Sequence, residues 1–133
     1  MDKFLNQYEI LFRKANTDFK AAKILLENFN DRDDELDADV IYFHLQQCAE
    51  KLLKSLLDYN NVKFPKIHDL RELISLLNDN RILLCVDNIE KLIRLNYYAV
   101  EGRYAIIHDN LIDVDIYIKI LEKLASFVKD IIC

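Results

Sequence analysis

The side chains best suited to chemistry in this sequence are a few histidines and cysteines. They are His44, His68, His108, Cys48, Cys85 and Cys133. Their spacing contains no pair of cysteines two residues apart and no His and Cys cluster typical of a metal site, and three distant cysteines predict no disulfide framework. We therefore expect neither a metal nor another cofactor. Cys48 lies in an apolar row and is interpreted as a small core residue.

A second group of residues combines cations with aromatic rings. Tyr97 and Tyr98 follow Arg94, and Arg103 and Tyr104 lie just beyond them. Aromatic rings stack on bases and arginine contacts phosphate, so this mixture predicts binding of single-stranded RNA, with Arg94, Tyr98 and Tyr104 as substrate-binding residues. In the alternative interpretation the tyrosines belong to the core and only an arginine is exposed.

Two histidines and two lysines are open to structural and functional interpretations. His68 precedes an expected helix and is interpreted as ordering that turn rather than binding substrate. His44 lies in an apolar helix, where it would hydrogen-bond across a contact between helices or protomers. Lys51 and Lys54, one helical turn apart, extend a cationic strip in one interpretation and are merely solvated in the other.

Composition limits both the fold and the partners. The chain has 133 residues, 52% of them hydrophobic, with one glycine and one proline. Turns draw on these two residues, so the sequence predicts one domain over residues 1–133 with few turns and long helices. A net charge of −5 excludes a strongly basic coat for nucleic acid but leaves room for a local cationic groove. No apolar run reaches the length of about 20 residues that crosses a bilayer, and the start lacks the pattern of a signal peptide. We expect a cytoplasmic protein with no membrane partner.

Apolar residues that recur three and four positions apart predict the helices that must position these side chains. The third helix begins at Asp69, whose carboxylate accepts from first-turn amides and forms a capping box with Glu72. The expected helices span about 3–29, 37–60, 69–77, 81–100 and 111–132. Amphipathic helices joined by short loops predict an all-α fold, an antiparallel bundle of about five helices.

Three stretches of the sequence resemble the HEPN domain family. Residues 43–57, FHLQQCAEKLLKSLL, resemble the second-helix pattern F-H-x-Q-Q-x-x-E-K-x-x-K-x-L-L. Residues 64–70, FPKIHDL, are similar to the turn F-P-x-x-H-D-L, and residues 98–104, YAVEGRY, resemble Y-x-x-E-x-R-Y. Their order and spacing extend the resemblance over essentially the whole chain. It implies a helical bundle that pairs into symmetric dimers.

The resemblance also implies a choice of functions. Many HEPN proteins are metal-independent ribonucleases, often toxins encoded beside a minimal nucleotidyltransferase antitoxin, whereas others bind a nucleotide or a partner protein without catalysis. Catalytic members carry an arginine followed about four to six residues later by a histidine, and Arg103 and His108 match that spacing. The implied function is a homodimeric ribonuclease with Arg103 and His108 as catalytic residues, and with RNA and a nucleotidyltransferase as partners. The alternative is a non-catalytic module.

The chemistry of RNA cleavage suits these residue types. Attack by the 2′-hydroxyl needs a base for its proton, an acid for the leaving 5′-oxygen and a cation for the charge on phosphorus. Histidine titrates near neutral pH and arginine offers a planar fork of donors to phosphate. One chain supplies only one such histidine, so a two-fold dimer would bring two copies of Arg103 and His108 to one cleft.

The stretch around this pair also departs from the family pattern. Residues five apart on a continuous helix point about 140° apart, so we predict a bend or loop between Arg103 and His108. Tyr104 stands where catalytic members usually carry a polar residue. Asn110 stands where one toxin subgroup carries a tyrosine that is modified with AMP, so this modification is not expected. In the structural interpretation, Arg103 pairs with a neighbouring carboxylate and His108 lies at a helix start.

Overall fold

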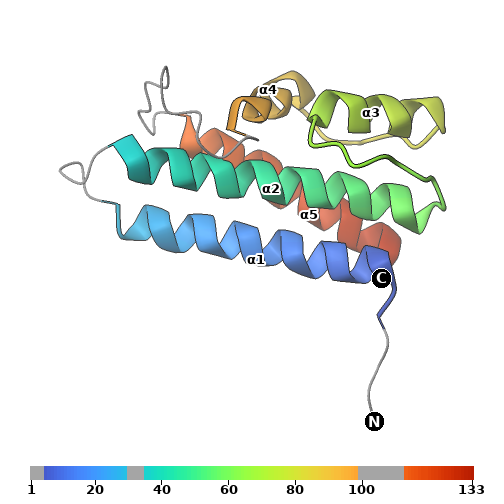
Figure 1. The fold of residues 1–133 in the computed structure, drawn as a ribbon, viewed down its shortest axis with the longest axis horizontal. Helices are drawn as coiled ribbons and strands as arrows, with labels where there is room; N and C mark the ends of the chain where they lie inside the picture. The colour runs from blue at the N-terminus through green and yellow to red at the C-terminus, as the bar shows by residue number, and fades with distance from the viewer. Residues whose placement is uncertain (1–4, 30–34, 99–112) are drawn as a thin grey trace, which may run out of the picture.

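Three long helices lie side by side, and shorter helices cover one side of the central one (Figure 1). The computed structural model describes residues 5–29, 35–98 and 113–133. All regular elements in these residues are helical, which confirms the predicted fold class. They are α1 (Gln7–Glu27), α2 (Glu35–Tyr59), α3 (Leu70–Asp79), α4 (Ile89–Ile93), the 3-10 helix η1 (Arg94–Tyr98) and α5 (Val114–Ile132).

Helix α2 occupies the centre of the molecule and packs against α1, α5, α3 and η1. Helix α1 runs antiparallel to α2 and α5, whereas α2 and α5 begin at the same end because the chain returns along α3 and α4 (Figure 1). Covered on several sides, α2 buries more than the single apolar row that the sequence predicts: Leu53 and Leu57 are as fully buried as Leu52 and Leu56.

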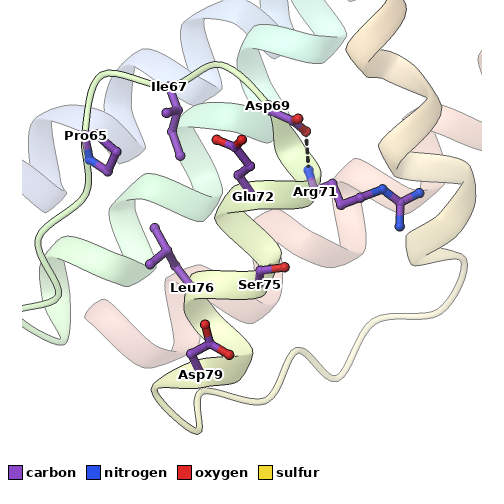
Figure 2. A pocket seen from close by; sticks show the side chains of 8 residues that line it. All are labelled: Pro65, Ile67, Asp69, Arg71, Glu72, Ser75, Leu76 and Asp79. Atoms are coloured by element: carbon purple, nitrogen blue, oxygen red, sulfur yellow. Dashed lines mark hydrogen bonds between the residues drawn. The ribbon is translucent and has the colours of Figure 1, made fainter.

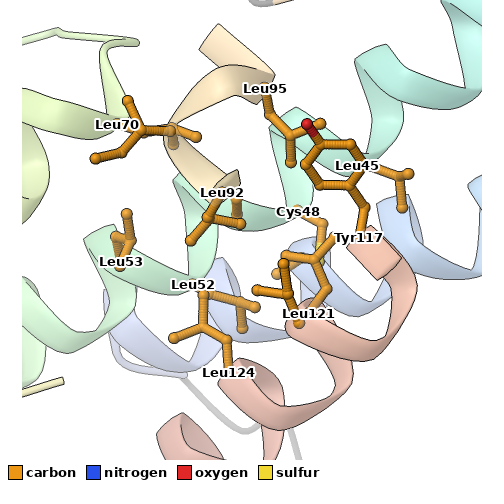
Figure 3. Packing of buried hydrophobic residues seen from close by; sticks show 14 of the residues in the cluster. Leu45, Cys48, Leu52, Leu53, Leu70, Leu92, Leu95, Tyr117, Leu121 and Leu124 are labelled. Carbon is orange, nitrogen blue, oxygen red and sulfur yellow. The ribbon is translucent and has the colours of Figure 1, made fainter. Parts of the chain in front are cut away.

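The hydrophobic core lies between α2 and the elements around it (Figure 3). Helices α3, α4 and α5 and the 3-10 helix η1 each contribute large side chains that have lost contact with water. Figure 3 labels Leu45, Cys48, Leu52, Leu53, Leu70, Leu92, Leu95, Tyr117, Leu121 and Leu124. On the α1 side the fully buried residues are small, Ala15 and Ala22, which lets the backbones of α1 and α2 approach closely.

Local signals determined the ends of several elements correctly. The third helix has Asp69 as its N-cap, and the Asp69 carboxylate accepts a hydrogen bond of 2.8 Å from the Arg71 amide. The predicted loop after α2 contains Asn61 with a φ of 60°, a left-handed conformation that asparagine adopts more readily than most residues.

The prediction of a helix over residues 81–100 is wrong for its first half. Residues 82–88 are irregular, and α4 begins only at Ile89, with Asn88 at a φ of 65° before it. A left-handed residue cannot continue a right-handed helix, so Asn88 separates the two stretches. Ile82 and Val86 pack against the core from irregular backbone, so their helical spacing does not reflect a helix. The predicted end at Val100, like the predicted start of the last helix at Leu111, lies outside the described residues.

In the part of the chain that the structure describes, no helix combines the length and apolar character needed to cross a membrane.

Truncating a core residue of α2 should cost a large part of the stability. Leu52 is fully buried, and we expect Leu52→Ala to lower the free energy of unfolding by about 2–5 kcal/mol through lost contacts and a residual cavity. Urea unfolding followed by circular dichroism measures this change. The control is Leu83→Ala: Leu83 is 75% exposed, and its truncation should change the same quantity by less than about 0.5 kcal/mol. Equal effects of the two variants would contradict the assigned core.

Candidate functional site

Three tyrosines meet at the end of the bundle where α2 and α5 begin. The ring of Tyr98, the last residue of η1, stacks on that of Tyr42 of α2, with centroids 4.8 Å apart and planes 21° apart. Tyr117 of α5 meets the same Tyr42 ring edge to face at 5.9 Å. We call Tyr42, Tyr98 and Tyr117 the tyrosine cluster. Such ring pairs add about 0.5–1.5 kcal/mol beyond burial, so the cluster joins η1, α2 and α5.

An ion pair ties the start of α5 to the same place. Lys91 of α4 lies 3.2 Å from the carboxylate of Asp113, the residue before α5. The Lys91 ammonium also lies 5.7 Å from the centroid of the Tyr117 ring. Tyr98 and Asp113, the described residues that flank positions 99–112 in the sequence, therefore both lie near the tyrosine cluster.

Arg94 brings an exposed cation to this region. Burial raises the pKa of Tyr117, the nearby Asp113 carboxylate raises it further, and the positive charge of Arg94 opposes both. Arg94 thus lies close enough to Tyr117 to be felt electrostatically, while its own side chain is exposed. Next to Tyr98, Tyr97 is 48% exposed.

The predicted substrate-binding and catalytic residues divide into two groups. Arg94 and Tyr98 lie beside the tyrosine cluster, Arg94 exposed and Tyr98 partly buried against the core. Arg103, Tyr104 and His108, with the predicted bend between Arg103 and His108, lie outside the described residues.

The motif residues of α2 make a buried polar network that the fold itself uses. Glu50 is only 4% exposed. Its carboxylate lies 3.0 Å from Lys54 Nζ and 3.1 Å from His68 Nδ1. The Gln46 amide donates to the same carboxylate at 3.4 Å and to the His68 carbonyl at 3.1 Å. This Glu50 network (Gln46, Glu50, Lys54 and His68) fastens the turn before α3 to α2, which agrees with an ordering role for His68.

A second polar cluster joins α1 to α2. Asp18 of α1 lies 3.0 Å from His44 Nδ1 and forms an ion pair with Lys51. Since an ionised carboxylate only accepts, this contact places a proton on His44 Nδ1. His44 therefore acts across a contact between helices of one chain. Lys51 and Lys54, each paired with a carboxylate and largely buried, do not form the cationic strip that the sequence suggested, nor are they simply solvated.

The cysteines show no arrangement for catalysis. Cys48 is buried, as predicted, and burial together with the nearby Asp18 charge raises the pKa of its thiol. A neutral buried thiol is inert because the thiolate is the nucleophile. Cys85 and Cys133 are exposed. Among residues 5–29, 35–98 and 113–133, no three His, Cys, Asp or Glu side chains gather as metal ligands would.

An open groove lies between α3 and the turn that precedes it (Figure 2). Its volume is about 530 Å³, and Pro65, Ile67 and Leu76 give it an apolar part. Its charged groups are mainly carboxylates, and the one arginine, Arg71, pairs with Glu90 at 3.2 Å. The lining is completed by Asp69, Arg71, Glu72, Ser75 and Asp79. Negative charge repels phosphate, so this groove does not suit RNA or a nucleotide.

Sequence reasoning missed Tyr42, Lys91 and Asp113 as neighbours of the site. Asp113 could have been found as an acidic residue directly before an amphipathic helix. No local signal predicts that Tyr42 lies against Tyr98 and Tyr117, because the three residues come from distant parts of the chain.

Comparison with known families gives one clear match. The family model of the HEPN domain matches residues 8–131, a range that includes nearly all of the helices described above. Comparisons with curated proteins and with solved structures gave no match.

Removing the charge of Glu50 should destabilise the fold. Glu50→Gln leaves Lys54, whose side chain is 12% exposed, without its carboxylate, and unpairing a buried charge costs about 3 kcal/mol or more. Urea unfolding measures the loss. Glu90→Gln is the matched control, since Glu90 is 79% exposed in its pair with Arg71 and such pairs contribute little. A stable Glu50→Gln protein would show that the network is not needed for folding.

The three thiols should differ in reactivity. With a disulfide reagent such as Ellman's, Cys85 and Cys133 should react rapidly in the folded protein, and Cys48 only after unfolding. The variant Cys85→Ser/Cys133→Ser isolates Cys48 and should release no chromophore until urea is added. Rapid reaction of that variant in buffer would contradict the burial of Cys48.

Proposed function

This chain belongs to the HEPN family, and we propose that it acts there as a homodimeric, metal-independent ribonuclease of the toxin type, paired with a minimal nucleotidyltransferase. The observation that carries the proposal is that the described residues on either side of positions 99–112 lie together. Tyr98 before this segment and Tyr117 soon after it contact the same ring of Tyr42.

The covalent chain limits how far the proposed catalytic side chains lie from that cluster. Arg103 follows Tyr98 by five residues, and His108 precedes Asp113 by five. Five residues span at most about 18 Å when fully extended. Tyr98 and Asp113, which flank the segment in the sequence, both lie near the tyrosine cluster, and this supports the proposal that Arg103 and His108 act at that end of the bundle.

The proposed reaction is transesterification at phosphorus. A neutral His108 takes the proton of the 2′-hydroxyl, the 2′-oxygen bonds to phosphorus, and the bond from phosphorus to the 5′-oxygen breaks. The protonated His108 of the partner subunit gives its proton to the 5′-oxygen, which leaves a 2′,3′-cyclic phosphate and a 5′-hydroxyl. Arg103 stabilises the negative charge on the phosphoryl oxygens. Two protomers are required because each chain has one histidine in this segment.

Residues near the tyrosine cluster support the binding of the substrate. Arg94 offers an exposed guanidinium to a phosphate, and Tyr97 exposes half of its surface for stacking on a base. We assign substrate contacts to Arg94, Tyr98 and Tyr104, with the ring of Tyr98 supported from behind by Tyr42.

Removing the proposed acid and base should abolish cleavage without disturbing assembly. We expect His108→Ala to lower the rate of RNA cleavage, measured in the presence of EDTA on a broad panel of RNAs, by at least about a hundredfold. Light scattering after size exclusion should show a dimer for both proteins. The rate of the wild type should have a bell-shaped pH dependence, because one histidine must be neutral and the other protonated.

Asn110→Ala serves as the control, since it alters the same stretch of chain without touching a proposed proton carrier. It should cleave RNA at the rate of the wild type. A wild-type protein that leaves every RNA intact, or a His108→Ala protein that cleaves equally well, would overturn the ribonuclease assignment and leave a non-catalytic HEPN module. A monomer in solution would contradict the shared cleft.

A further inference from the structure

The outer face of α1 carries an excess of positive charge in a chain whose net charge is −5. The exposed charged residues of α1 are four cations and one carboxylate, Glu27. Arg13, Lys20 and Lys23 lie within about 80° of one another around the helix, and we call these three the α1 basic face, whereas Lys14 points away from them. On α5, the other long helix with a solvated side, the exposed charges balance, with three of each sign. Helix α1 can therefore attract an anionic ligand, whereas the balanced charges of α5 favour neither sign of charge.

The charges of the α1 basic face are available to a ligand. The ion pairs found among the described residues involve none of the exposed cations of α1. The one acidic residue in the middle of α1, Asp18, turns to α2 and is occupied by His44 and Lys51. Lys23 Nζ lies 4.5 Å from the centroid of the Phe19 ring, a contact that holds the side chain along the helix and leaves its charge in place.

The spacing of these cations suits a polymer with a repeated negative charge. Arg13 and Lys20 are seven residues apart on one face, which is about 10 Å along the axis, and Lys23 extends the row by about 5 Å. Asn16 lies exposed between them and can donate a hydrogen bond to a phosphate oxygen, whereas the Thr17 hydroxyl donates to the Arg13 carbonyl at 3.1 Å. A linear row of this kind matches a nucleic acid backbone better than a single anionic group.

The register of α1 against α2 shows how far this row of cations extends toward the end of the bundle that holds the tyrosine cluster. Asp18 contacts both His44 and Lys51, so it lies at a level between them on the antiparallel helix. Because both helices rise equally per residue, Lys23, five residues beyond Asp18, lies near the level of Tyr42. The row thus reaches the height along the bundle at which Tyr42 of the tyrosine cluster lies.

We infer that the α1 basic face binds the phosphate backbone of single-stranded RNA and presents the strand to the end of the bundle that holds the tyrosine cluster. This inference deepens the proposed ribonuclease function and rests on it for the choice of RNA over other polyanions. A local row of cations on α1 lets a protein with a net charge of −5 attract an anionic substrate.

The test compares charge removal on two helices. The variant Lys20→Gln/Lys23→Gln removes two cations from the α1 basic face, and Lys119→Gln/Lys123→Gln removes two exposed cations from α5. Binding of a fluorescent single-stranded RNA is measured by anisotropy between about 50 and 200 mM salt, in a His108→Ala background so that no substrate is consumed. Each lost phosphate contact should reduce the slope of log K against log salt by about 0.7. Two lost contacts weaken binding about twentyfold near 0.1 M salt.

The expected result is this loss in the α1 variant, little change in the α5 variant, and recovery in Lys20→Arg/Lys23→Arg, which restores the charges. Equal losses on both helices, or no loss on either, would overturn the inference by showing a general charge effect or another binding surface. So would unchanged RNA binding together with weakened binding to vesicles of phosphatidylserine, which would assign the face to a lipid surface.

Failure of this inference is distinguishable from failure of the proposed function. Cleavage is measured separately in proteins that retain His108. Salt-sensitive RNA binding through α1 without any cleavage supports the binding face and overturns the ribonuclease assignment. Cleavage of RNA by a protein whose RNA binding does not change when Lys20 and Lys23 are replaced supports the ribonuclease assignment and overturns the binding face.

Discussion

The central burial of α2 is the constraint on which the rest of the structure depends. Because α1, α5, α3 and η1 all pack against it, a polar side chain on α2 loses water and needs a partner inside the protein. Glu50 pairs with Lys54 and His68, and Lys51 pairs with Asp18. The contacts of Glu50 with His68 and of Lys51 with Asp18 join α2 to the turn before α3 and to α1, so the polar residues of α2 also help to position the elements around it.

This arrangement separates the residues that maintain the fold from those left for chemistry. The charged residues in the α2 motif form ion pairs within the chain. These contacts explain why charged residues occur in the motif without any role in ligand binding. Of the remaining candidates, Arg94 and Tyr98 lie at the tyrosine cluster, where Arg94 is exposed. The bundle brings Tyr98 and Tyr117, which lie on either side of positions 99–112 in the sequence, to the one ring of Tyr42.

Charge is also distributed unevenly over the surface. The groove beside α3 has carboxylates and an apolar part, α5 carries balanced charges, and α1 presents cations. Net charge alone therefore predicts weak attraction of nucleic acid, whereas the local field near α1 is positive. At physiological salt, screening limits exposed charges to about 8 Å, so the local distribution governs what binds to each face.

Sequence patterns alone predicted the helical class, most helix positions and the family, because amphipathic spacing, the Asp69 cap and the motif residues are local features. They misplaced the start of α4, since the spacing of Ile82 and Val86 is compatible with a helix even though they pack from irregular backbone. The contact of Glu50 with His68, and those of Tyr42 with both Tyr98 and Tyr117, became known only from the assembled fold. These contacts join residues far apart in the chain, and their energy comes from burial and pairing that exist only after the helices have assembled.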